Sequence, residues 1–210
     1  STEALRQSSL ALVEAYPGLH VRAYAGDYFD VLESHAVCLE RKTLAMLMGS
    51  NVGNYEPDEA RELLRLLGEA LRPGDGLLLG ADLKKDRATL ELAYNDPAGV
   101  TAAFNRNVLA RINRELDADF DVRNFKHVAQ YDEARGSVDS FLEARDGAVV
   151  SVRSRGLQIQ IRPGERIHTE SSYKFTDDEI VGLAAAGGFM PAASWRDRAG
   201  RFAVHLLVRE

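Results

Sequence analysis

The feature that most constrains the fold is a succession of two apolar runs with an amphipathic segment between them. Thr43–Met48 has the character of a buried strand, and Leu77–Ala81 is apolar on both faces, as expected of a strand covered from two sides. Between them, Pro57-Asp58-Glu59-Ala60 is a typical helix start, and the leucines that follow give one apolar face. Strand, helix and strand in this order predict a parallel sheet with crossover helices.

Further helices and strands are predicted at both ends of the chain. Thr2–Tyr16 has apolar residues at near-helical spacing and stops at a Pro-Gly pair, and His20–Ala25 then has the character of a strand. Near the C terminus, Thr176 is a suitable N-cap for a helix that ends at a Gly-Gly pair. The last two predicted strands, 195–197 and 201–208, form a pair that turns at an Ala-Gly dipeptide.

The second half of the chain has a different pattern. Helical periodicity runs from Asp86 to Leu116 with an interruption at Asn95–Gly99, and short strand-like runs follow, separated by turns rich in Gly and Pro. Such runs predict antiparallel strands, which we expect to form a small lobe on the main sheet. The runs are Phe125–Tyr131, Ser137–Ala144 and Val149–Ile161.

Composition and charge exclude several classes of function. The 210 residues include 26 Lys+Arg and 32 Asp+Glu, a net charge of −6, so we expect no nucleic-acid partner. No apolar run reaches the roughly 18 residues of a membrane-spanning helix, so we expect no membrane partner. The histidines are scattered and Cys38 is the one cysteine, so we expect no metal site and a cytoplasmic location. A small molecule is the expected partner.

The loops that follow the predicted strands hold the candidate ligand-binding residues, because ligands of open α/β sheets bind beyond the carboxyl ends of the strands. Asp27 and Tyr28 offer a carboxylate for an amino group and a ring to flank a planar base; the alternative is a solvated turn with a packed Tyr. Gly49–Asn54 lets a ligand approach the backbone, and the Asn54 amide can donate to a carboxylate; the alternative is a turn that caps the next helix.

A run of polar residues, Ile167–Lys174, follows a strand of the predicted lobe. Glu170 and Ser172 alternate along an extended chain, so they face the same way and form a two-point hydrogen-bonding edge for a ring with N–H donors. The alternative interpretation is an ordinary polar surface loop.

Five motifs occur in order along the chain: Gly49–Asn54, Asp82–Asp86, Ala93–Asp96 with Gly99–Asn105, Arg111–Leu116 and Ile167–Lys174. In this order they resemble the histidine-specific, S-adenosylmethionine-dependent Nα-methyltransferases of ergothioneine biosynthesis. The resemblance implies an α/β fold with a Rossmann-like class I methyltransferase core and an inserted antiparallel α+β substrate lobe. The implied domains are a partial core over 1–90, a substrate-binding lobe over 91–174, and the final helix and strand pair of the core over 175–210.

The same resemblance implies the reaction and the cofactor site. Three methyl groups pass in succession from S-adenosylmethionine to the α-amino group of L-histidine, giving hercynine. Matched by motif, Asp27 and Tyr28 lie against the adenine of the cofactor, and Gly49 and Ser50 belong to the cofactor site. Methyl transfer is an in-line displacement that needs an aligned, unprotonated amine, so no covalent nucleophile is expected.

The substrate residues follow by the same match. Asn54 and Tyr94 hold the carboxylate and amino end of L-histidine. Glu170 and Ser172 bind the imidazole, with Ser171 supplying backbone between them. A site built to bind both ring nitrogens rejects a substrate that lacks them, because its own polar groups are then left unpaired.

The sequence departs from the family pattern in two respects. A glycine-rich cofactor loop, an acidic residue for the ribose and an N-terminal segment precede this region in the family and do not occur here. We therefore expect an N-terminal polypeptide to complete the fold, and poor cofactor binding by these 210 residues alone. Ser140 replaces a larger apolar residue near the substrate. Two alternatives remain: a methyltransferase for a tryptophan-derived or other bulkier amino acid, and a non-catalytic binding module.

Overall fold

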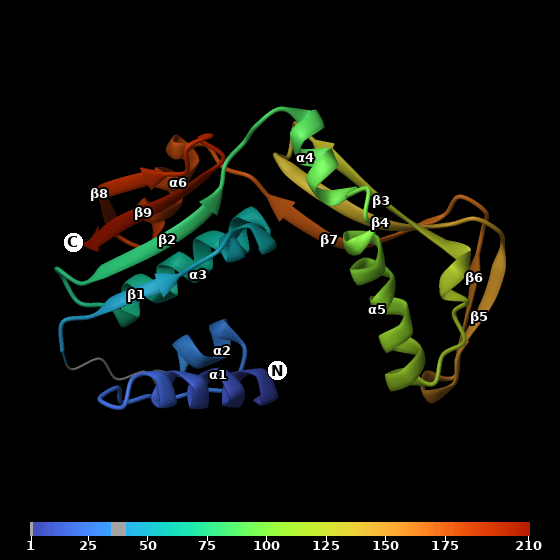
Figure 1. Ribbon diagram of the computed structural model, residues 1–210, viewed down its shortest axis with the longest axis horizontal. Helices are drawn as coiled ribbons and strands as arrows, with labels where there is room; N and C mark the ends of the chain where they lie inside the picture. The colour runs from blue at the N-terminus through green and yellow to red at the C-terminus, as the bar shows by residue number, and fades with distance from the viewer. Residues whose placement is uncertain (1, 35–40) are drawn as a thin grey trace.

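The computed structural model describes residues 2–34 and 41–210, which form a core built on one sheet and a lobe that extends from it (Figure 1). His35 and the lone cysteine, Cys38, lie outside the described residues. In Figure 1 the core is at the left and the lobe at the right, and strand β7 runs between them. No helix in the described part of the chain is long and apolar enough to cross a membrane.

The core sheet has four strands in the order β1-β2-β9-β8. β1 (Leu44–Leu47) and β2 (Gly76–Asp82) pair in parallel, and α3 (Pro57–Ala70) connects them. β9 (Phe202–Arg209) pairs antiparallel with β2, and β8 (Phe189–Arg196) pairs antiparallel with β9. The parallel pair with its crossover helix is therefore confirmed. The C-terminal strand pair is confirmed as well, but its first strand begins at Phe189 and not at the predicted residue 195.

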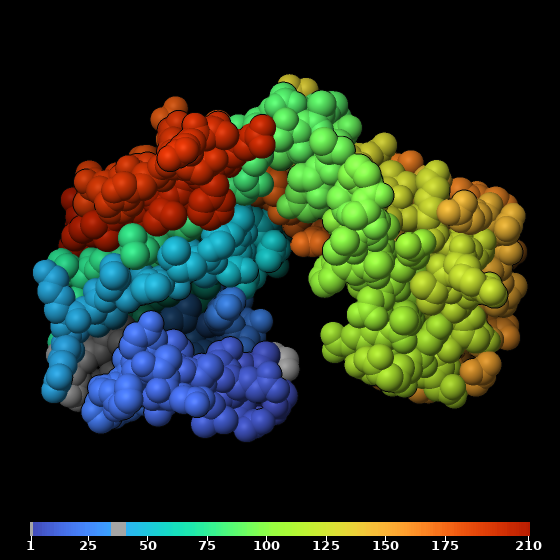
Figure 2. Space-filling view, viewed as in Figure 1, coloured from blue at the N-terminus to red at the C-terminus, as the bar shows by residue number. Residues whose placement is uncertain are grey.

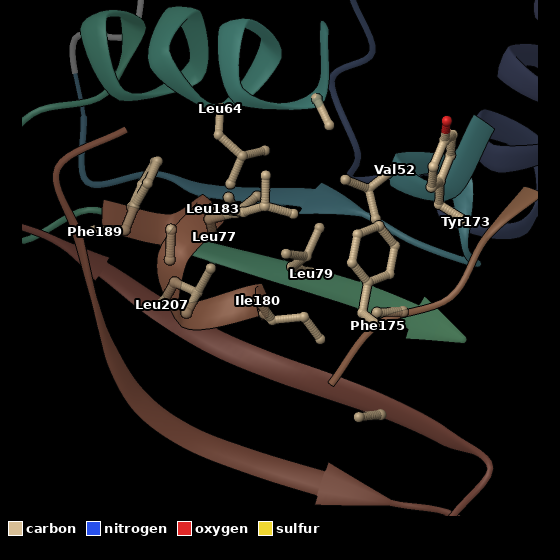
Figure 3. Close-up of a cluster of buried hydrophobic side chains, with 14 of the residues drawn as sticks. Val52, Leu64, Leu77, Leu79, Tyr173, Phe175, Ile180, Leu183, Phe189 and Leu207 are labelled. Carbon is tan, nitrogen blue, oxygen red and sulfur yellow. The ribbon is translucent and has the colours of Figure 1, made fainter. Parts of the chain in front are cut away.

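Two helices cover the buried face of this sheet. Leu64 of α3 packs with Leu77 and Leu79 of β2 and with Ile180 of α6 (Asp177–Ala186), all fully buried (Figure 3). Each such side chain contributes about 1.5–3 kcal/mol relative to an exposed one. The predicted N-cap of α6 is confirmed, because Thr176 and Glu179 form a reciprocal capping box.

The lobe is a second, antiparallel sheet with two helices on one face. β3 (Phe125–Asp132), β4 (Ser137–Ala144) and β7 (Arg166–Tyr173) lie in the order β3-β4-β7. α4 (Arg87–Tyr94) and α5 (Val100–Leu116) pack on this sheet and bury Leu90 and Leu109. The helical interruption predicted between them is confirmed. Short 3-10 turns, η2 (Val122–Asn124) and η3 (Arg153–Arg155), join the remaining segments.

The structure corrects one prediction about the lobe and rejects one alternative interpretation. Val149–Ile161, taken as one strand, is the hairpin of β5 (Ala148–Val152) and β6 (Leu157–Ile161), because the chain turns at Gly156, which has φ +61°. The polar run 167–174 is not a surface loop; most of it is β7, the edge of the lobe sheet nearest the core.

Two further corrections concern the N-terminal part. α1 (Thr2–Ala15) is confirmed, but His20–Ala25 is not a strand: it pairs with no described strand, and its side chains are mostly exposed. α2 (Tyr28–Glu33) follows directly. β1 is not fully buried, since Leu44 and Met46 are 51% and 62% exposed. The reason is its position, because β1 is the edge strand of the core sheet and has no neighbouring strand on one side among the described residues.

Candidate active site

The carboxyl ends of the parallel strands meet the end of β7 at Asp82. The Asp82 backbone N–H donates to Ser50 Oγ at 3.0 Å, which ties the loop after β1 to the end of β2. Its carboxylate pairs with Lys174 Nζ at 3.2 Å, and Phe175 N–H donates to the Asp82 carbonyl at 3.0 Å. The core and the lobe thus share one junction at the place where ligands of open α/β sheets bind.

Gly49, predicted to belong to the cofactor site, lies where the loop after β1 packs closely on β2. Gly49 has φ +68°, a conformation that disfavours other residues. A Cβ on Gly80 of β2 would lie 2.4 Å from the Gly49 carbonyl oxygen, so the two backbones are in direct contact. The loop that holds Gly49 and Ser50 is therefore fixed against β2.

One face of β7 carries the predicted substrate residues. Glu170 pairs across the ladder with Ser140 of β4, and Ser172 pairs with Val138, so Glu170, Ser172 and Ser140 share a face. Ser140 and Ser172 are buried. Glu170 is exposed, and its carboxylate makes no hydrogen bond or ion pair within the described residues. The predicted alternation of Glu170 and Ser172 is confirmed.

Ser171 lies on the opposite face of β7. Its hydroxyl donates to Asp139 Oδ1 at 2.7 Å and contacts His168 Nε2 at 3.0 Å. The Ser171 side chain is thus separated from Glu170 and Ser172, and only its backbone lies between them, as the sequence predicted.

Tyr94, at the end of α4, reaches the same face as Ser172. Its hydroxyl donates to Ser172 Oγ at 2.8 Å and accepts from Lys174 Nζ at 2.7 Å. Its backbone carbonyl is 2.8 Å from His127 Nε2, and the Asn105 amide nitrogen is 2.8 Å from His127 Nδ1. Because an amide N–H2 can only donate, this arrangement makes Nε2 the protonated ring nitrogen and fixes the end of α4 on β3.

Asn54 reaches the site through the 3-10 turn η1 (Asn51–Asn54), which packs on β7. A Cβ on the neighbouring Gly53 would lie 2.6 Å from the Tyr173 carbonyl oxygen. The Asn54 side chain is exposed and makes no hydrogen bond within the described residues, so its amide is available to a ligand. It does not cap the following helix, whose N-cap is Glu56.

Asp27 and Tyr28 lie apart from these residues, beside β1 and α3. They line a cavity of about 250 Å3 with apolar walls from residues such as Met46 and Leu67. The Asp27 carboxylate caps α2 by accepting from Phe29 N–H at 2.9 Å, and half of the Tyr28 surface is exposed. A carboxylate, an aromatic ring and apolar walls fit a planar base that carries an amino group.

A second cavity, of about 360 Å3, lies between α3, α6 and β7. On its wall the Tyr173 hydroxyl donates to the Glu56 carboxylate, and Arg135 bonds to both. The hydrogen bond from Tyr173 holds the pKa of Glu56 below its usual value, while burial raises the pKa of Tyr173. This cluster joins the N-terminus of α3 to the lobe.

Sequence reasoning missed Lys174 and Asp82 as site residues, although both belong to the motifs singled out above. Their significance comes from an ion pair between distant segments, which no local pattern reveals. In residues 2–34 and 41–210, no group of three or more His, Cys, Asp or Glu side chains could hold a metal ion.

The core has the fold of class I S-adenosylmethionine-dependent methyltransferases. A crystal structure of such an enzyme from Clostridium acetobutylicum aligns with all of this chain and 72% of its own, with a TM-score of 0.50 and 11% identity. The chain belongs to the family of histidine-specific, S-adenosylmethionine-dependent methyltransferases, whose model matches residues 1–209. The expected fold class and family are therefore confirmed.

Individual relatives agree with this assignment. Over 207 residues the chain is 41% identical to a histidine N-alpha-methyltransferase of Mycolicibacterium smegmatis and 40% identical to that of Mycobacterium tuberculosis, covering 98% of this chain. It is 26% identical to ergothioneine biosynthesis protein 1 of Schizosaccharomyces pombe over 82% of this chain and 23% of the relative. The chain spans 63% of the length of the two bacterial relatives.

Proposed function

We propose that this chain supplies the histidine-binding part of an enzyme that methylates the α-amino group of L-histidine three times, to hercynine, with S-adenosylmethionine as donor. The observation that carries the proposal is the pair formed by Glu170 and Ser172 on one face of β7. Residues two apart on a strand are separated by about 7 Å, a spacing that accommodates one small ring bound at both sides.

An imidazole ring suits this pair chemically. Its N–H donates to the free carboxylate of Glu170, and its second nitrogen accepts from the Ser172 hydroxyl. A ring without these nitrogens leaves the buried Ser172 hydroxyl unpaired, at a cost of about 1–3 kcal/mol, and leaves the exposed Glu170 carboxylate without its ligand partner. This cost favours L-histidine over a tryptophan-derived amino acid, even though the small buried Ser140 leaves room beside Glu170.

The amino-acid end of the substrate is assigned to Asn54 and Tyr94. The Asn54 amide is free to bind the carboxylate, and Tyr94 bounds the site from α4. These residues hold the α-amine in one position and shield it from water, which is what an in-line displacement requires. Residues 91–174 are proposed as the substrate lobe, between core segments 1–90 and 175–210.

The cofactor contacts are assigned to Asp27 and Tyr28 for the adenine and to Gly49 and Ser50 near the strand ends. S-adenosylmethionine, when bound, supplies an electrophilic methyl group. Asp27 would accept a hydrogen bond from the adenine amino group, and the exposed ring of Tyr28 would cover the base. A cytoplasmic location remains a prediction from the cysteine content.

A further polypeptide segment is proposed to pair with the free edge of β1. Leu44 and Met46 expose apolar surface on this edge strand, and a strand added there would cover it. Full cofactor affinity is expected only when such a segment is present, supplied either by the same polypeptide or by a separate one.

The test is a methyl-transfer assay with L-histidine and S-adenosylmethionine, read by mass spectrometry, on this chain alone and with the N-terminal part of a bacterial relative added. Mono-, di- and trimethylated histidine are expected in the second case. A preference for a bulkier amino acid would favour the larger-pocket alternative. Binding of L-histidine with no transfer in either case would show a binding module instead.

A further inference from the structure

Lys174 is a buried cation at the centre of the proposed substrate face. Its side chain lies almost wholly out of solvent, and the residue is 2% exposed. The Nζ atom lies 2.7 Å from Tyr94 Oη, 2.8 Å from Ser172 Oγ and 3.2 Å from Asp82 Oδ2. It also sits 4.8 Å from the centre of the Tyr94 ring. Every partner of this ammonium therefore belongs to the junction of core and lobe.

Lys174 Nζ, Tyr94 Oη and Ser172 Oγ form a closed cycle of hydrogen bonds. Tyr94 Oη and Ser172 Oγ are 2.8 Å apart, and both are bound by Lys174 Nζ. An ammonium has three hydrogens to donate and no lone pair to accept with, and its three contacts use all of its hydrogens. The two hydroxyls share one hydrogen between them, with Tyr94 as donor, so only one hydroxyl hydrogen is left over.

That remaining hydrogen belongs to Ser172. A serine hydroxyl has two lone pairs, and Lys174 and Tyr94 occupy both. Ser172 can therefore only donate to a ligand, and it cannot accept from one. Without the ammonium, one lone pair is released, and the Ser172 hydroxyl can act in either sense.

We propose that Lys174 is a positioning residue that fixes Ser172 as a hydrogen-bond donor and thereby sets the preference for a ring with one acceptor nitrogen. The inference rests on the proposed function and deepens it. With Glu170 as acceptor and Ser172 as donor, the face is complementary to neutral imidazole. A ring with no nitrogen leaves the Ser172 hydrogen unpaired.

Two substitutions separate this role from general support of the fold. Lys174→Met keeps an unbranched side chain, one atom shorter, and removes the donors. Asp82 keeps its pair with Lys85, whose Nζ lies 2.5 Å from Oδ1. Lys85→Met is the matched control, because it removes the other ammonium from the same carboxylate. The hydrogen bonds of Lys85 within the described residues go to Asp82 and Arg201 only.

The experiment measures the binding of L-histidine and of β-(2-thienyl)-L-alanine, a five-membered ring without nitrogen, by titration calorimetry. Lys174→Met is expected to bind L-histidine roughly tenfold or more weakly and the thienyl analogue almost unchanged. Lys85→Met should bind both as the unaltered chain does. The double variant Lys174→Met with Ser172→Ala should be no weaker than Ser172→Ala alone, because Lys174 acts through Ser172.

Three results would overturn the inference. They are equal loss for both ligands, additive losses in the double variant, and unchanged histidine affinity in Lys174→Met. If Lys174→Met does not fold, Lys174→Leu, which also has no donor, replaces it with the same expectations. If the unaltered chain does not prefer L-histidine over the analogue, both the proposed function and the inference are wrong. If that preference holds and Lys174→Met retains it, only the inference fails.

Discussion

Gly53 packs directly on the backbone of Tyr173, so closely that a Cβ on Gly53 would lie 2.6 Å from the Tyr173 carbonyl oxygen. The two residues belong to different bodies, Gly53 to the turn after β1 and Tyr173 to the last position of β7. This contact packs the turn that holds Asn54 on the strand that holds Ser172. Figure 2 shows an open hollow between the N-terminal part of the core (blue) and α5 of the lobe (yellow-green).

Gly53→Ala should therefore separate the turn from β7. We expect the free energy of unfolding to fall by about 1–3 kcal/mol, as for other overpacked sites, and the affinity for L-histidine to fall as well. Urea unfolding and calorimetry measure the two effects. Gly182→Ala in α6 is the matched control, because its Cβ would meet nothing within 4 Å, and it should be neutral or slightly stabilising. Equal stability of the two variants would contradict this account of the junction.

Glu170→Gln should damage recognition of L-histidine selectively. The carboxylate is the acceptor proposed for the ring N–H, and Gln keeps an acceptor oxygen but lacks the charge that strengthens this hydrogen bond, so histidine binding should weaken roughly tenfold. Binding of the cofactor product S-adenosylhomocysteine should not change, because Asp27 and Tyr28 lie in a separate cavity. Glu133→Gln, on the exposed turn between β3 and β4, is the control. Equal loss of histidine and cofactor binding would remove Glu170 from the substrate site.

Asp96 should make the stability of the chain sensitive to acid. Hydrogen bonds from Thr101, followed by that from the Val100 N–H, lower the pKa of Asp96 from 3.8 to about 2. Because the folded pKa is the lower one, the carboxylate stabilises the fold above about pH 4, and this contribution is lost as the pH falls toward about 2. Above about pH 4, Asp96→Asn should have a lower free energy of unfolding than the unaltered chain. As the pH falls toward about 2, the unaltered chain loses this advantage, so the difference between the two should shrink. A difference that stays constant down to about pH 2 would contradict the assignment.

Tyr173→Phe should release the Glu56 carboxylate. The Tyr173 hydroxyl is the largest cause of the lowered pKa of Glu56, so the pKa should rise toward its usual value in the variant. NMR titration of the Glu56 carboxyl carbon measures the shift. Tyr131→Phe, in β3, is the control and should leave Glu56 unaffected. An unchanged pKa in Tyr173→Phe would mean that Arg135 alone holds this carboxylate.

Much of the fold could be predicted because its signals are local. The leucine spacing of α3, the apolar run of β2 and the N-cap Thr176 each depend on neighbouring residues. The alternation of Glu170 and Ser172 was equally local. His20–Ala25 could not be assigned correctly, because a segment with strand composition becomes a strand only when another strand pairs with it.

The ion pair at the centre of the site could not be predicted from local sequence patterns. Asp82 and Lys174 each look like ordinary exposed charges in the sequence, and only the parallel bridge between Leu83 and Phe175 brings them together. The burial of Ser140 and Ser172 likewise depends on α4 lying over the lobe sheet. Tertiary contacts of this kind decide which polar residues bind a ligand.

The most direct test of the central claim is a crystal structure of the chain with L-histidine bound. We expect one imidazole nitrogen within about 2.7–3.2 Å of the Glu170 carboxylate and the other within the same range of Ser172 Oγ. The α-amine should then point toward the carboxyl ends of β1 and β2. Histidine bound instead in the cavity beside Arg61 and Arg135, with Glu170 and Ser172 free of ligand, would contradict the account.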